Sequence, residues 1–77
     1  MKKFRVFYDV SDTSQVLQGT VELRLDDEDK TIFRKLKELG LKYNRRINKV
    51  IWWDDDYAEI INKKTERTLG ILEVCYR

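Results

Sequence analysis

The sequence contains no histidine, no proline and a single cysteine among its 77 residues. Without histidine there is no imidazole for a Ser-His or Cys-His catalytic pair, and the commonest metal ligand is missing. The one cysteine, Cys75, excludes an internal disulfide, and its alternating apolar surroundings favour a small strand residue over a nucleophile. The glycines Gly19, Gly40 and Gly70 stand alone and form neither a dinucleotide fingerprint nor a P-loop. We therefore expect a non-enzymatic protein without a cofactor or a metal.

Long apolar runs are also missing. No stretch approaches the roughly 20 apolar residues of a membrane span, and residues 1–3 lead into an alternating segment rather than the apolar core of a signal peptide. We expect a cytoplasmic protein without membrane contact, and nothing in the sequence indicates a small-molecule substrate. A chain this short builds a small core, and since disulfides and histidine-based metal sites are excluded, oligomerisation is the remaining route to extra stability.

Two strands are predicted in the first third of the chain. Apolar and polar side chains alternate over residues 4–10 and again over residues 17–25, and the period of two is typical of strands. Residues 11–14 are typical turn residues, so the two strands form a hairpin. Gly19 within the second strand indicates a bulge or a close backbone approach.

One helix follows. Ile32, Phe33, Leu36 and Leu39 form one apolar stripe at helical spacing. Asp26 or Asp27 is expected to cap the N-terminus. Gly40 is expected to end the helix in a left-handed conformation, with Leu41 returning to contact Leu36.

The C-terminal half predicts further strands at residues 49–53 and 68–76, which are rich in β-branched and aromatic residues. Residues 56–65 fit either a strand or a helix, and a strand is preferred. We therefore expect one α+β domain over residues 1–77, an antiparallel sheet of about five strands with one helix packed on one face. Its order is β-β-α-β-β-β, or β-β-α-β-α-β if residues 56–65 are helical.

A single helix covers one face of such a sheet and leaves the other open. Because neighbouring strand residues point to opposite faces, Trp52 and Trp53 separate, and large apolar groups remain on the open face. The first hypothesis is therefore a protein that self-associates or binds a protein partner. The residues expected in this interface are Phe7, Trp52, Trp53 and Ile71. In the alternative arrangement, one tryptophan packs at the sheet edge.

The charges are segregated along the chain. Residues 30–49 hold eight basic residues and one acid, a local charge of +7, so that the rest carries −5 of the overall +2. Such a split favours association with partners of complementary charge. Together with the small size and the missing catalytic residues, it also fits a regulator or inhibitor of a larger complex, of the kind that viruses and mobile elements encode. The second hypothesis is a nucleic-acid-binding module. Its expected contact residues are Lys42, Tyr43, Arg45, Arg46 and Lys49.

Carboxylates offer the one remaining route to catalysis. Asp9, Asp12 and the run 54–56 lie at expected strand ends, where they could converge on a divalent ion. A metal-dependent hydrolase is therefore a third hypothesis, although the spacing matches no cation-binding loop.

Overall fold

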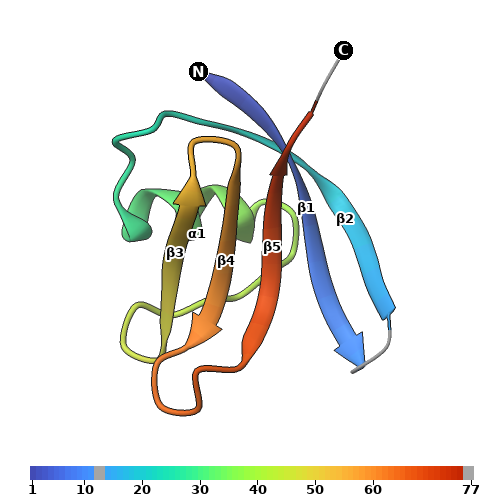
Figure 1. Ribbon diagram of the computed structural model, residues 1–77, viewed down its shortest axis with the longest axis vertical. Helices are drawn as coiled ribbons and strands as arrows, with labels where there is room; N and C mark the ends of the chain where they lie inside the picture. Colours follow the sequence, from blue (N-terminus) through green and yellow to red (C-terminus); the bar gives the residue numbers. More distant parts are fainter. Residues whose placement is uncertain (12–13, 76–77) are drawn as a thin grey trace.

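A computed structural model describes residues 1–11 and 14–75 of the chain, and this part contains five strands and one helix (Figure 1). The elements are β1 (Lys2–Ser11), β2 (Ser14–Leu23), α1 (Asp29–Lys37), β3 (Asn48–Asp54), β4 (Tyr57–Asn62) and β5 (Thr68–Val74). The α+β class and the order β-β-α-β-β-β are confirmed. The ambiguous segment forms the strand β4, which agrees with the preferred interpretation.

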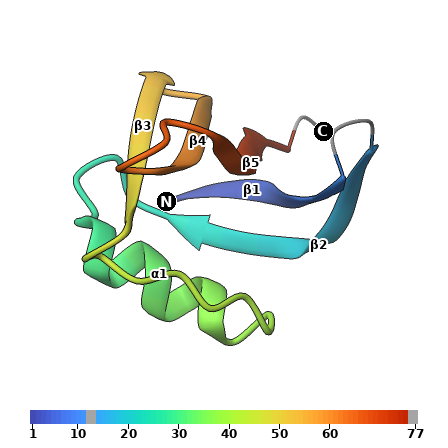
Figure 2. The same ribbon diagram turned by 90° about the horizontal axis from the view of Figure 1, so that it is seen from below.

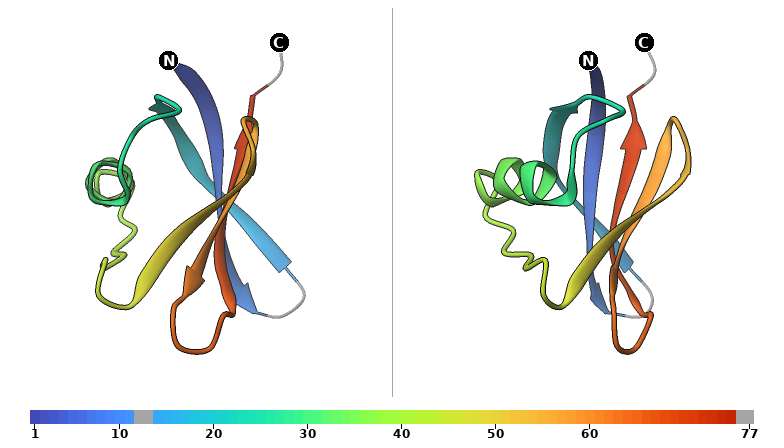
Figure 3. Two further views of the ribbon diagram at one scale, coloured as in Figure 1. Left: turned by 60° about the vertical axis from the view of Figure 1, so that its left-hand side comes forward. Right: turned by 90° about the vertical axis from the view of Figure 1, so that its left-hand side faces the viewer.

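The five strands form one antiparallel sheet in the order β2-β1-β5-β4-β3. The N-terminal hairpin and the C-terminal meander are joined through β1 and β5, whose register sets Phe4 opposite Val74 and Tyr8 opposite Gly70. The sheet is strongly twisted, so β2 and β3 diverge at its two edges (Figure 3). Both edges therefore expose strand backbone along part of their length.

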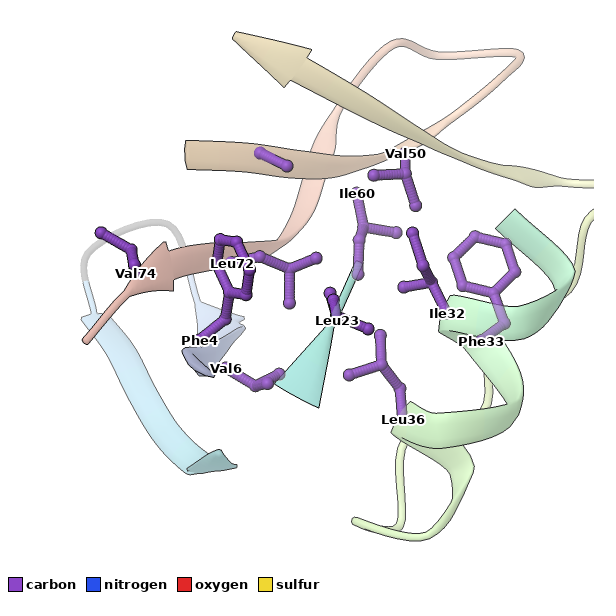
Figure 4. Close-up of a cluster of buried hydrophobic side chains, with 11 residues drawn as sticks. Phe4, Val6, Leu23, Ile32, Phe33, Leu36, Val50, Ile60, Leu72 and Val74 are labelled. Carbon is purple, nitrogen blue, oxygen red and sulfur yellow. The ribbon is translucent and has the colours of Figure 1, made fainter. Parts of the chain in front are cut away.

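Helix α1 packs against one face of this sheet (Figures 2 and 3). Ile32 and Leu36 are completely buried, and Phe33 nearly so, as the apolar stripe predicts. They meet side chains from all five strands (Figure 4). The strand residues in this core include Phe4, Val6, Leu23, Val50, Ala58, Ile60, Leu72 and Val74. No helix in the described ranges is long and apolar enough to span a membrane.

The N-terminus of α1 differs from the expectation. The N-cap residue is Glu28, and its side chain makes no capping hydrogen bond. Asp27 turns away instead, and its Oδ2 accepts hydrogen bonds from Arg24 N (2.9 Å) and Lys35 Nζ (3.2 Å). The prediction that Asp26 or Asp27 caps the helix is wrong, because Asp27 stabilises the preceding turn and links it to the middle of the helix.

The C-terminus of α1 ends as predicted. Gly40 has φ +88°, in the left-handed region that favours glycine. Gly40 N donates to Lys37 O (2.9 Å), and Leu41 N donates to Leu36 O (3.2 Å). These two bonds define the Schellman motif. The chain therefore reverses sharply after the helix, and the following connection, residues 38–47, runs back beside it.

Candidate functional site

A shallow groove lies between helix α1 and the connection 38–47. Five basic side chains line it, together with apolar and amide groups, and no carboxylate does. We call this surface the basic groove. Its lining residues are Lys30, Phe33, Arg34, Lys37, Leu41, Lys42, Tyr43, Asn44, Arg45 and Ile47.

The helix contributes three of the five cations for a simple geometric reason. Since Ile32, Phe33 and Leu36 must face the sheet, the residues at positions 30, 34 and 37 fall together on the outer side. Like charges three and four residues apart destabilise a helix by roughly 0.2–0.5 kcal/mol per pair. The helix dipole favours Arg34 and Lys37 in the last turn, but the three cations still repel one another, and an anionic ligand would relieve this repulsion.

The groove cations have no carboxylate partners within the described residues. The ion pairs found there join Lys2 to Asp56 (2.6 Å), Arg5 to Glu73 (2.5 Å) and Lys35 to Asp27 (3.2 Å). None of these basic groups lines the groove. No ion pair within the described residues therefore neutralises the cations of the groove.

The connection is held in place by Asn48, a buried polar residue that the sequence reasoning missed. Asn44 N donates to Asn48 Oδ1 (2.9 Å), Asn48 N donates to Asn44 O (2.6 Å), and Asn44 Oδ1 accepts from Arg46 N (2.9 Å). Lys63 Nζ donates to Arg45 O, which ties the connection to the turn after β4. These bonds fix the backbone while Arg45 and Arg46 stay exposed.

Tyr43 packs against the core. Its ring lies 5.6 Å from that of Phe33, and its hydroxyl donates to Leu69 O (3.3 Å). Burial raises the pKa of the Tyr43 phenol above its usual value. The ring is therefore not available for base stacking, and the exposed apolar group of the groove is Ile47, which is 57% exposed.

The predicted nucleic-acid residues thus divide. Lys42 and Arg45 line the groove and Arg46 lies exposed beside Arg45, whereas Lys49 lies on β3 in another depression with Asp29 and Ile51. The helical cations were not among the predicted site residues. Their spacing along the helix was the signal that could have found them.

The predicted protein interface divides as well. Trp52 faces the helix side, where its ring meets Phe4 edge to face at 5.5 Å, so its assignment to an interface on the open face is wrong. Trp53 is 64% exposed and falls at a register shift of β3, so the two indoles differ in burial. Phe7 and Ile71 are cross-strand partners on the open face, where Ile71 is only 9% exposed.

The described residues of the hydrolase hypothesis lie far apart. Asp56 binds Lys2 at the start of β1, whereas Asp9 lies seven residues further along that strand, about 23 Å away at 3.3 Å per residue. Asp12 lies outside the described residues, as does the side chain of Asp9. Within the described part no group of three or more His, Cys, Asp or Glu side chains is placed to hold a metal ion.

The fold and its surfaces define a small α+β domain with one basic groove and a separate acidic turn at residues 54–56. No protein family model, no curated protein and no solved structure matches this chain. Its function is therefore inferred from its own side chains.

Proposed function

We propose that this protein is a non-enzymatic binding domain whose basic groove binds the phosphate backbone of a nucleic acid. The observation that carries the proposal is the set of five cations around one groove with no carboxylate in its lining. Basic groups that neutralise phosphates release condensed counterions, and this release drives binding.

The dimensions of the groove suit such a ligand. From Lys30 to Lys37 the helical stripe spans about 10 Å at 1.5 Å per residue. Double-stranded DNA carries one charge per roughly 1.7 Å of axis, so several phosphates fall within reach of the stripe. Lys42 and Arg45 provide a second row across the groove.

The acidic turn does not oppose this ligand. Residues 54–56 lie at the end of β3. The connection that lines the groove precedes the start of this strand, about 20 Å away along its seven residues. That separation exceeds the Debye length of about 8 Å at physiological ionic strength. Repulsion from the acidic turn is therefore largely screened.

The groove contains no aromatic ring free to stack on a base, because Tyr43 packs on Phe33. We therefore expect binding that depends on phosphates and discriminates little between sequences. The expected salt dependence is steep, with log affinity falling by about 0.7 per phosphate contact for each unit of log salt on a single strand.

The test uses fluorescence anisotropy with a labelled 20-nucleotide DNA, single-stranded and duplex, in 20 to 200 mM salt. Arg34→Glu combined with Arg45→Glu is expected to weaken binding at least tenfold and to reduce the salt slope. Lys3→Glu combined with Arg24→Glu is the matched control, because it changes the net charge equally at exposed positions outside the groove.

Three outcomes would contradict the proposal. These are no binding at 20 mM salt, equal losses in the groove and control variants, or polyglutamate binding the wild type as tightly as DNA does. The last result would indicate an acidic protein segment as the ligand.

A protein partner at the β3 edge of the sheet is a second candidate function, favoured by the exposed Trp53. A tryptophan that is 64% exposed on an edge strand is costly in water, and tryptophan is enriched at binding hot spots. Such contact would suit a regulator or inhibitor of a larger complex. Affinity capture from the native host by wild type and by Trp53→Ala tests it: a protein lost with the variant supports this function, and identical captures contradict it.

A further inference from the structure

Strand β2 is an edge strand, since β1 is its one neighbour in the sheet. Cys75 N donates to Lys3 O (2.8 Å), so Lys3 directs its backbone toward β5. Alternate residues of an antiparallel strand bond to opposite neighbours, so Phe4 and every second residue after it bond toward β2. Arg5 and Phe7 bond toward β5, as Lys3 does. Their partners on β2, Thr20 and Leu17, therefore direct their N–H and C=O groups away from β1, toward the open edge.

Helix α1 covers one end of this edge. Lys35 Nζ donates to Glu22 O (2.9 Å), which agrees with the outward direction of alternate β2 carbonyls. Gln18 Nε2 donates to Leu39 O (2.6 Å) at the end of the helix. The other half of β2 extends away from α1, at the lower right of Figure 1. Within the described residues, no hydrogen bond from α1 or from the turn after it reaches residues 15–17.

This open half also lacks the usual chemical protection. Natural edge strands carry lysine, proline or other charges that prevent pairing with another chain. Residues 13–21 are the longest uncharged stretch of a chain that is 39% charged, and the chain has no proline. Val16 and Leu17 are 38% and 54% exposed. Two register shifts interrupt the pairing of β2 with β1, one near Gln18 and one between Gln15 and Ser14.

We propose that β2 pairs with β2 of a second copy of this chain, antiparallel about a two-fold axis near Leu17. The self-pairing is isologous, and it brings no like charges opposite each other because the paired segment is uncharged. An uncharged edge forms no ion pairs with a charged peptide from another protein. A second copy of the same uncharged strand pairs with it without repulsion.

The side chains on the open face support the same partner. Leu17 lies beside Phe7, and Phe7 lies beside Ile71 on the next strand. A two-fold axis perpendicular to the sheet continues this apolar row into its symmetry mate, so Leu17 of each copy covers the other. The basic groove includes no β2 residue and stays uncovered, so the inference is independent of nucleic-acid binding.

Sedimentation equilibrium of the full chain from 5 µM to 1 mM tests the proposal. We expect a monomer–dimer equilibrium, with the dissociation constant raised at least tenfold by Leu17→Lys, which puts two ammonium groups at the axis. Ile47→Lys is the matched control, because Ile47 is 57% exposed outside the strands, and it is expected to dimerise like the wild type.

A second variant examines the backbone directly. Leu17→Pro removes an N–H that the β1–β2 ladder does not use, so the hairpin tolerates it while pairing between copies loses a donor. Hydrogen exchange should show protection at Leu17, at the proposed axis, that rises with protein concentration. A monomeric wild type at 1 mM, or a dimer broken by Trp53→Ala but not by Leu17→Lys, would overturn the proposal.

Discussion

The hydroxyl of Tyr43 occupies the space above Gly70, where a Cβ atom on residue 70 would lie only 2.6 Å from the hydroxyl oxygen. The same Cβ would lie 3.2 Å from Phe7 O, and the hydroxyl donates to Leu69 O (3.3 Å). The connection that lines the basic groove is therefore anchored in a gap left by a missing side chain in the centre of the sheet.

Gly70→Ala is accordingly expected to destabilise the fold by about 1–3 kcal/mol, because the methyl group must displace the tyrosine. Tyr43→Phe alone should cost about 1 kcal/mol through the lost hydrogen bond. In the double variant the methyl group has room, so the combined loss should fall short of the sum by at least about 0.5 kcal/mol. Urea denaturation of the four proteins measures this coupling, and strict additivity would contradict the contact.

The two tryptophans should respond in opposite ways to truncation. Trp52→Ala removes a ring that packs on Phe4 and the core, so a loss of about 2–3 kcal/mol is expected. Trp53→Ala removes an exposed ring and should change stability by less than about 0.5 kcal/mol. Thermal denaturation of the two variants side by side provides the measurement. Equal losses would show that Trp53 also packs against the fold.

Local patterns were sufficient to predict the elements. Alternation over residues 4–10 and the apolar stripe of the helix reflect which side chains must be buried, and Gly40 specifies a conformation that glycine adopts readily. Asp27 shows the limit of such patterns. Several acids precede the helix. Asp27 does not cap it but binds Lys35, a partner that can be identified only in the folded structure.

The candidate surfaces depended on tertiary arrangement. The helical cations and Arg45 meet because the chain reverses after Gly40, and the burial of Tyr43 depends on a glycine 27 residues later. The exposed edge of β2 could not be identified without the strand order β2-β1-β5-β4-β3, since a hairpin alone does not say which strand is outermost. Periodicity in the sequence shows on which face of a strand or helix a residue lies, but it does not show which residues from other elements lie next to it.

Gly40→Ala tests the reversal that positions the groove. A φ of +88° is costly for a residue with a Cβ, so we expect a loss of about 1 kcal/mol or more. Gly40→Asn should cost less, because asparagine tolerates left-handed conformations better. Urea denaturation gives the ranking Gly, Asn, Ala, and an alanine variant as stable as the wild type would contradict the left-handed assignment.

Asp27 should make stability depend on pH in the acid range. The backbone N–H of Arg24, and with it the Lys35 ammonium, lowers the pKa of the Asp27 carboxyl below its usual value. A depressed folded-state pKa contributes stability that is fully present above the unfolded pKa of about 3.9 and is lost as the pH falls through the folded value. Asp27→Asn should therefore lower the melting temperature by a constant amount between pH 5 and 7, and the difference should shrink below about pH 4.

The neighbouring Asp26→Asn is the control for this titration, because Asp26 is exposed and takes part in none of the ion pairs of the described residues. Its melting temperature should follow the wild type at every pH. Calorimetry from pH 2 to 7 compares the three proteins. A difference between Asp27→Asn and wild type that persists unchanged at pH 2 would show that the side-chain geometry, and not the charge, stabilises the turn before α1.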